Sequence, residues 1–206
     1  MLVENRIIEI YEKKLKNCIN IPNNSIIKKT LIALIFAISN IAAGTLYQVR
    51  KLINTDILQT LGSISKITKC NDVLSEIIIT FTNLLAILNT EGHSNEDDFL
   101  NVFKYEPLRI FCDGMRSSNK ETIINNSIKG IFNIIMSFDK IPKDKLQEVE
   151  IEINTVTPLI NNLIFGKNEL LAENAKSLLN KYLEYKKYRK ILNSNFMDTE
   201  MINMEY

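Results

Sequence analysis

The sequence predicts an all-α protein in which similar helical units are stacked along one axis, and three observations support this prediction. Only 6 glycines and 4 prolines interrupt the 206 residues, which favours long helices over a β fold with many turns. Long apolar stretches recur along the chain at 26–43, 71–89 and 119–138. Each stretch carries an asparagine near its end, at Asn40, Asn83 and Asn133. The spacings between these asparagines, about 43 and about 50 residues, are typical of helical repeats.

The first predicted unit contains two helices separated by a polar break. Residues 3–17 place apolar side chains near helical spacing, which predicts an amphipathic helix. Ser25 follows a Pro-Asn-Asn sequence and is a suitable N-cap for the helix at 26–43. We expect Gly44 to end that helix, because glycine enters the left-handed conformation without a steric penalty. The apolar positions of the first helix are Val3, Ile7, Ile10, Tyr11 and Leu15.

Three further units follow, and each is predicted to contain two short helices and then one long helix. The predicted helices lie at 45–53, 56–64 and 71–89, at 96–104, 107–115 and 119–138, and at 144–156, 157–165 and 169–190. This order is typical of armadillo repeats, whose long third helices line a concave surface. We therefore expect an armadillo-type, right-handed superhelical solenoid of about three and a half repeats.

The predicted solenoid is a single domain covering residues 1–192, because one unit cannot bury its apolar face without the next. The residues after it, 193–206, scatter acidic side chains among Met and Asn and are expected to form a disordered tail. Within the domain the repeat units are roughly 1–44, 45–90, 95–139 and 144–190.

Composition excludes several classes of protein. The net charge is +1 and no long basic stripe is present, so nucleic acid is not an expected partner. Cys18, Cys70 and Cys112 are odd in number and far apart, which favours free thiols in a reducing compartment over a disulfide framework. The first 17 residues are too charged for a signal peptide, and the longest apolar run, Leu31–Ile38, is too short to cross a bilayer. We expect a soluble intracellular protein without a membrane partner.

Residues that carry chemistry are sparse, and we expect neither enzymatic activity nor a cofactor or metal. The single histidine, His93, lies in a polar stretch beside Glu96, Asp97 and Asp98. With no Cys or second His nearby, a surface loop is the better interpretation than a metal site. No arrangement of Ser, His and Asp, and no glycine-rich phosphate loop, is evident.

The segment around Asn40, ISNIAAGT followed by YQVRKLI, resembles the armadillo repeats of importin-α (karyopherin-α). The order of helices is similar to the seventh to tenth repeats of that family, in divergent form. The resemblance implies a nuclear-import adaptor, or its C-terminal part, that works in the cytoplasm and nucleus. Its implied partners are basic localisation-signal peptides of cargo proteins and the export receptor that recycles importin-α, which would contact the C-terminal repeats. No importin-β-binding segment is visible, because Glu4, Glu9 and Glu12 interrupt the basic residues at the start.

The resemblance also implies a peptide-binding site. In the family, the Asn of each third helix hydrogen-bonds the backbone of an extended peptide, Trp rings stack on its Lys and Arg side chains, and carboxylates meet the charged tips. Matched by position, Asn40 and Asn83 keep the amides and Asn133 is a candidate third member. The remaining candidates are Phe36 and Ile79 at the Trp positions and Glu76 at the acidic position.

Departures from the family pattern weaken the expected binding. The chain has no Trp, Ile79 offers no aromatic ring, and Ala33 stands where an acidic residue is usual. The chain is therefore expected to be either a C-terminal fragment or a reduced relative, with weak peptide binding.

Simpler interpretations of the same residues are available. An Asn near a helix end can be a cap, Phe36 can be a core ring and Glu76 a solvated charge. The alternative function is an armadillo scaffold that binds another extended partner and has no role in nuclear transport. A third class is a structural helical module that docks onto other subunits.

Overall fold

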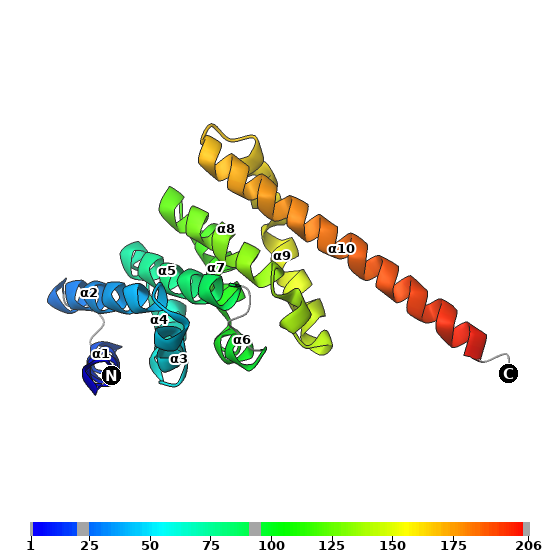
Figure 1. Cartoon of the computed structure of the whole chain (residues 1–206). Coiled ribbons are helices and arrows are strands. Elements are labelled where there is room, and N and C mark those ends of the chain that lie inside the picture. Colours follow the sequence, from blue (N-terminus) through cyan, green and yellow to red (C-terminus); the bar gives the residue numbers. More distant parts are fainter. Residues whose placement is uncertain (1, 20–24, 91–95, 204–206) are drawn as a thin grey trace.

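The computed structural model describes residues 2–19, 25–90 and 96–203, with side chains for 6–18, 25–90 and 96–190. Over these residues it contains α-helices, one short 3₁₀ helix and no strand (Figure 1). The helices are α1 (Leu2–Ile19), α2 (Ser25–Ala42), α3 (Leu46–Ile53), α4 (Ile57–Ile67), α5 (Asn71–Leu88), α6 (Glu96–Phe103), α7 (Pro107–Ser117), α8 (Glu121–Ile135), η1 (Phe138–Lys140), α9 (Lys143–Ile164) and α10 (Glu169–Asn203). The predicted all-α solenoid is confirmed.

The long helices pack on one another in the order of the chain. Helix α5 packs between α2 and α8, and α8 packs between α5 and α10. We call these four helices the inner row. The other helices support them from one side; α7, for example, packs on α8 and α5, and α9 packs on α10 (Figure 1). Each long helix therefore keeps one face free of other described helices.

One apolar core runs the length of the stack. Ile35 and Ile38 of α2, Phe81 of α5 and Ile131 of α8 are fully buried and belong to a single cluster. Burying one such side chain stabilises the fold by about 1.5–3 kcal/mol. Because the cluster crosses every boundary between repeats, the repeats stabilise one another.

Two glycines allow the supporting row to approach the inner row closely. A Cβ on Gly130 of α8 would lie 2.3 Å from the Phe111 ring of α7. A Cβ on Gly114 of α7 would lie 2.6 Å from Ile78 of α5. A side chain at either position would displace these neighbours, so the two glycines allow α7 to sit close to α5 and α8.

Gly44 has a different role from the predicted one. Its backbone is not in the left-handed conformation, but a Cβ there would lie 2.1 Å from Oε1 of Gln48. That oxygen accepts a hydrogen bond from the Thr45 N–H at 2.9 Å. Together with the Gln48 N–H bond to Thr45 Oγ1 it forms a capping box at the start of α3. Glycine at this position leaves room for the Gln48 side chain to complete the capping box.

The C-terminal unit differs from its prediction in two ways. The predicted helices at 144–156 and 157–165 form one continuous helix, α9, that passes through Pro158. No glycine or polar turn precedes this proline, and Thr157 instead donates its hydroxyl to the Ile153 carbonyl inside the helix. Helix α10 continues to Asn203, so most of the expected tail, 193–206, is helical. No glycine or proline after residue 169 stops this helix.

Helices α2 and α5 are each long and apolar enough to cross a bilayer by length and composition alone. The length of the longest uninterrupted apolar run, Leu31–Ile38, did not predict this, because polar residues interrupt the apolar sequence of both helices. Both belong to the packed inner row, where 50% of α5 but only 28% of α2 is buried. The apolar composition of α5 thus serves the core, whereas much of α2 remains uncovered.

Candidate functional site

The three predicted asparagines occupy equivalent places on successive inner-row helices. Asn40 is exposed, and Asn83 and Asn133 are half-buried. Each follows a residue packed toward the inside and lies on the free face of its helix. We call this free face of α2, α5, α8 and α10 the asparagine face.

The amides of Asn83 and Asn133 bind the preceding helix in the same way. Asn83 Nδ2 donates to the Ser39 carbonyl at 3.2 Å, and Asn133 Nδ2 donates to the Thr82 carbonyl at 3.2 Å. Ser39 and Thr82 are the residues just before Asn40 and Asn83. Each amide therefore joins neighbouring repeats at a corresponding point.

These hydrogen bonds leave part of each amide available to a ligand. An Asn side chain has two N–H donors and a carbonyl oxygen that accepts two hydrogen bonds. One donor of Asn83 and one of Asn133 are used, so the second donor and Oδ1 remain. The side chain of Asn40 makes no hydrogen bond to another described residue. All three amides thus have hydrogen-bonding groups that no other described residue uses.

A second set of side chains fixes the ends of α5 and α8. Asn89 Nδ2 donates to the Asn133 carbonyl at 2.7 Å, and Ser137 donates its hydroxyl to Asn89 Oδ1. Lys140 Nζ donates to the Leu88 carbonyl at 3.2 Å. These contacts hold Asn133 in register with Asn83.

The position four residues before each asparagine changes character along the stack. Phe36 has 56% of its surface exposed, so the core interpretation of this ring does not apply. Ile79 is half-buried on α5, and Lys129 is exposed on α8. An aromatic, an aliphatic and a cationic side chain thus follow one another across the asparagine face.

Glu76 has an unusual environment for a carboxylate. It is half-buried, and its Oε2 is shielded from solvent and has no hydrogen-bond partner among the described residues. Burial, and next the nearby charge of Asp72, raise the pKa of Glu76. Asp72 itself forms an ion pair of 2.7 Å with Lys120, and this hydrogen bond lowers its pKa. Glu76 therefore lacks a cation that Asp72 possesses.

The fourth inner-row helix extends the asparagine face with residues that were not predicted. The alternation of buried and exposed positions over 121–136 of α8 recurs over 169–184 of α10. By this match, Lys181 stands where the earlier helices carry asparagine. Its Nζ lies 3.4 Å from the Glu184 carboxylate. Comparing the apolar patterns of 119–138 and 169–190 would have revealed this substitution.

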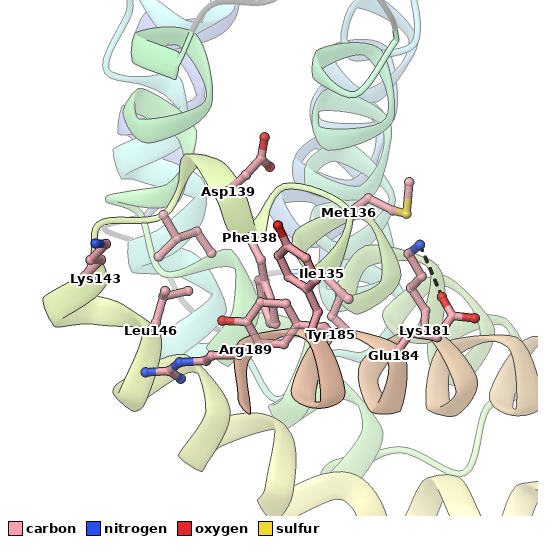
Figure 2. Close-up of a pocket in the computed structure, with 12 residues that line it drawn as sticks. Ile135, Met136, Phe138, Asp139, Lys143, Leu146, Lys181, Glu184, Tyr185 and Arg189 are labelled. Carbon is pink, nitrogen blue, oxygen red and sulfur yellow. Dashed lines mark hydrogen bonds and ion pairs between the residues drawn. The ribbon is translucent and has the colours of Figure 1, made fainter. Parts of the chain in front are cut away.

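A cavity of about 620 Å³ adjoins the end of the asparagine face (Figure 2). It lies between the C-terminal end of α8, η1, the start of α9 and the middle of α10. Phe138 and Tyr185 line it with their rings edge to face, 4.2 Å apart at the centroids. Met136, Lys181 and Glu184 line one side of it, and Lys181 belongs to both the cavity and the asparagine face. The cavity is large enough for a ligand group, since binding pockets commonly measure about 300–1,000 Å³.

The described residues offer little for catalysis or metal binding. No group of three or more His, Cys, Asp or Glu side chains could hold a metal in the ranges the structure describes, and His93 lies outside them. Cys112 is buried, and this burial raises the pKa of its thiol, which keeps it neutral. The polar side chains of the asparagine face are suited to binding.

Neither a protein-family model nor a curated protein sequence matches the chain, so no sequence match supports the resemblance to importin-α. Solved structures of designed armadillo repeat proteins do match. One, YIII(Dq)4CqI, is 20% identical with a TM-score of 0.61 over 83% of this chain and 62% of its own. Another, YIII(Dq.V1)4CPAF in complex with peptide (KR)4, is 19% identical with a TM-score of 0.62 over 82% of this chain. The chain spans about 62% of the length of either design. It has the armadillo-type solenoid fold.

Proposed function

We propose that the asparagine face binds an extended segment of another protein through the amides of Asn40, Asn83 and Asn133. An extended peptide needs partners for the backbone N–H and C=O groups that it presents to a protein surface. The equivalent placement of the three amides, each with unused hydrogen-bonding groups, is the observation that carries this proposal. A structurally similar designed armadillo protein is itself in complex with the peptide (KR)4.

Within this proposal, a basic peptide is the ligand that Phe36 and Glu76 favour. A Lys or Arg over an exposed ring gains about 0.5–1 kcal/mol. Glu76 lacks a cation, and a basic side chain of the ligand would supply one at the part of this half-buried carboxylate that stays open to solvent. The finer form of the proposal is a role like that of a nuclear-import adaptor, with basic localisation signals as ligands, an export receptor as a further partner and residence in the cytoplasm and nucleus. With Phe36 as the only aromatic ring at these positions, we expect a Kd on the order of micromolar or weaker.

An armadillo scaffold for a different extended partner is the second candidate. Ile79 and Lys129 favour it, because neither side chain attracts a cation. Both candidates use the same amides and differ in the charge of the ligand.

Calorimetric titration with (KR)4 and with an acidic peptide of equal length tests both candidates. Binding of (KR)4 alone supports the basic-peptide form, and binding of another extended peptide alone supports the scaffold. Asn83→Ala should weaken binding about 2- to 10-fold, since each backbone hydrogen bond contributes about 0.5–1.5 kcal/mol. Asn161→Ala, on the exposed surface of α9, is the matched control and should leave affinity unchanged.

Asn83 also joins α5 to α2, so the thermal melting of each variant must accompany the titration. We expect Asn83→Ala to remain folded at 25 °C with a Tm lowered by a few degrees. If wild type binds a peptide and both Asn83→Ala and Asn133→Ala bind it equally well, the peptide does not bind at the asparagine face.

A further inference from the structure

We propose that the ligand of the asparagine face carries charges of both signs, with a Lys or Arg opposite Glu76 on α5 and an Asp or Glu opposite Lys129 on α8. This inference rests on the peptide site proposed above and specifies the sequence that the site selects. A purely basic peptide would be a poorer ligand than one that matches both helices.

The charges along the asparagine face are few and are arranged in order. The corresponding segments of the three asparagine-bearing helices are 32–43, 75–86 and 125–136. The first contains no charged residue, the second contains only Glu76, and the third contains only Lys129. An extended chain that crosses from α5 to α8 therefore passes from a negative to a positive side chain.

Neither charge is neutralised by another described residue. Glu76 Oε2 has no hydrogen-bond partner, and Lys129 is exposed and forms no ion pair with the residues that the structure describes. Two neighbouring charges are already paired, Asp72 with Lys120 at 2.7 Å and Lys181 with Glu184 at 3.4 Å. Within the segments 32–43, 75–86 and 125–136, Glu76 and Lys129 are thus the two charges that a ligand can neutralise.

Lys129 also stands where Phe36 and Ile79 stand on the earlier helices, four residues before the asparagine. A basic ligand side chain gains contact with the Phe36 ring but meets a like charge at Lys129. One exposed ion pair changes affinity by about 1.5- to 5-fold. When an acidic ligand residue replaces a basic one opposite Lys129, a repulsion is lost and an attraction of similar size is gained. The preference for an acidic residue at this position should therefore be measurable.

The spacing of helices and peptide residues fixes how the ligand charges are grouped. Packed helices lie about 8–10 Å apart. An extended chain advances about 3.3 Å per residue and turns every second side chain away. Ligand side chains that reach α5 and α8 are therefore an even number of residues apart. A peptide with blocks of like charge satisfies this condition, whereas a peptide that alternates Lys and Glu presents one sign only.

The experiment is fluorescence anisotropy with four octapeptides at fixed ionic strength. One is (KR)4, two contain four basic and four acidic residues in blocks of either order, and one alternates Lys and Glu. Wild type should bind one block peptide about three- to tenfold more tightly than both (KR)4 and the alternating peptide. Lys129→Glu should reverse the preference in favour of (KR)4. Lys14→Glu, on the exposed surface of α1, is the matched control and should preserve the wild-type order.

The possible results distinguish failure of the charge preference from failure of the proposed peptide-binding function. The inference is wrong if wild type binds (KR)4 as tightly as both block peptides or more tightly, and if Lys129→Glu shows the same order of affinities. This result would leave the peptide site intact. Equal binding of block and alternating peptides overturns it as well, because composition alone would then decide. Failure of wild type to bind any peptide overturns both the inference and the proposed function.

Discussion

At the scale of single residues, the asparagines have a structural role, to which the proposed function adds a second one. Asn83 and Asn133 each use one N–H to reach the backbone of the preceding helix, and the proposed peptide site would use the rest of the amide. The spacing of the three asparagines predicted their common face. It could not predict the bonds to Ser39 and Thr82, because contacts between residues more than 40 positions apart leave no local pattern.

Ile79→Trp should strengthen the binding of (KR)4 about two- to fivefold. The new ring would lie on the same face as Phe36 and Glu76 and would add a cation–π contact of about 0.5–1 kcal/mol. Calorimetry measures the gain, and Ile151→Trp on the exposed surface of α9 is the control. A folded Ile79→Trp protein that binds no better than wild type would exclude basic side chains at this position.

Glu76→Gln should stabilise the protein while weakening the binding of basic peptides. The pKa of Glu76 is raised above its unfolded value, so its ionisation opposes folding at neutral pH. This cost disappears as the pH falls below the unfolded pKa of 4.5, where the carboxyl is protonated in both states. Melting curves should therefore show a higher Tm for Glu76→Gln at pH 7 and no difference near pH 3. A lower Tm at pH 7 would show that Glu76 has a stabilising partner.

At the scale of helices, most boundaries followed from the sequence, because polar and glycine-containing breaks separate the apolar stretches. The exception is Pro158, which was expected to start a helix and instead lies within α9. When no turn residue precedes a proline, the sequence does not show whether the proline lies in the first turn of a helix or in its interior. The face of α1 was also predicted only in part, since Ile8 and Leu15 are buried while Ile7 and Ile10 are exposed.

Gly44→Ala should destabilise the protein by about 0.5–2 kcal/mol, the usual contribution of an N-cap. The backbone at Gly44 would accept alanine, but the new Cβ would displace the Gln48 side chain from the Thr45 N–H. Denaturant unfolding measures the loss. In combination with Gln48→Ala, Gly44→Ala should add little, because the capping box is already broken. Fully additive losses would mean that Gly44 acts independently of Gln48.

At the scale of the whole molecule, the recurrence of long apolar helices was sufficient to predict an armadillo-type solenoid. What lies at its two ends was less predictable. Lys181 interrupts the series of asparagines at one end, and a cavity lined by Phe138 and Tyr185 adjoins it. Side chains of α8, η1, α9 and α10 meet there, and their meeting depends on how the last repeat packs.

The opposite end of the stack leads to a prediction about association. Terminal repeats need a polar outer face to stay soluble. Here Ile7 and Ile10 of α1 are 38% and 51% exposed, and α2 buries less of its apolar length than α5 does. We therefore expect the chain to self-associate reversibly as its concentration rises, which multi-angle light scattering would measure.

Replacing both Ile7 and Ile10 by Lys should reduce this association without loss of folding, because neither side chain belongs to the core. The matched control replaces Ile151 by Lys on the remote surface of α9, where association should be unchanged. If the wild-type chain stays monomeric at all concentrations, the exposed isoleucines of α1 are too few to bind a second copy. If association persists in the Ile7 and Ile10 variant, the contact must lie on another surface. The uncovered part of α2 is then the next surface to test: Phe36→Ser should reduce the association, and (KR)4 should compete with a second copy for that ring.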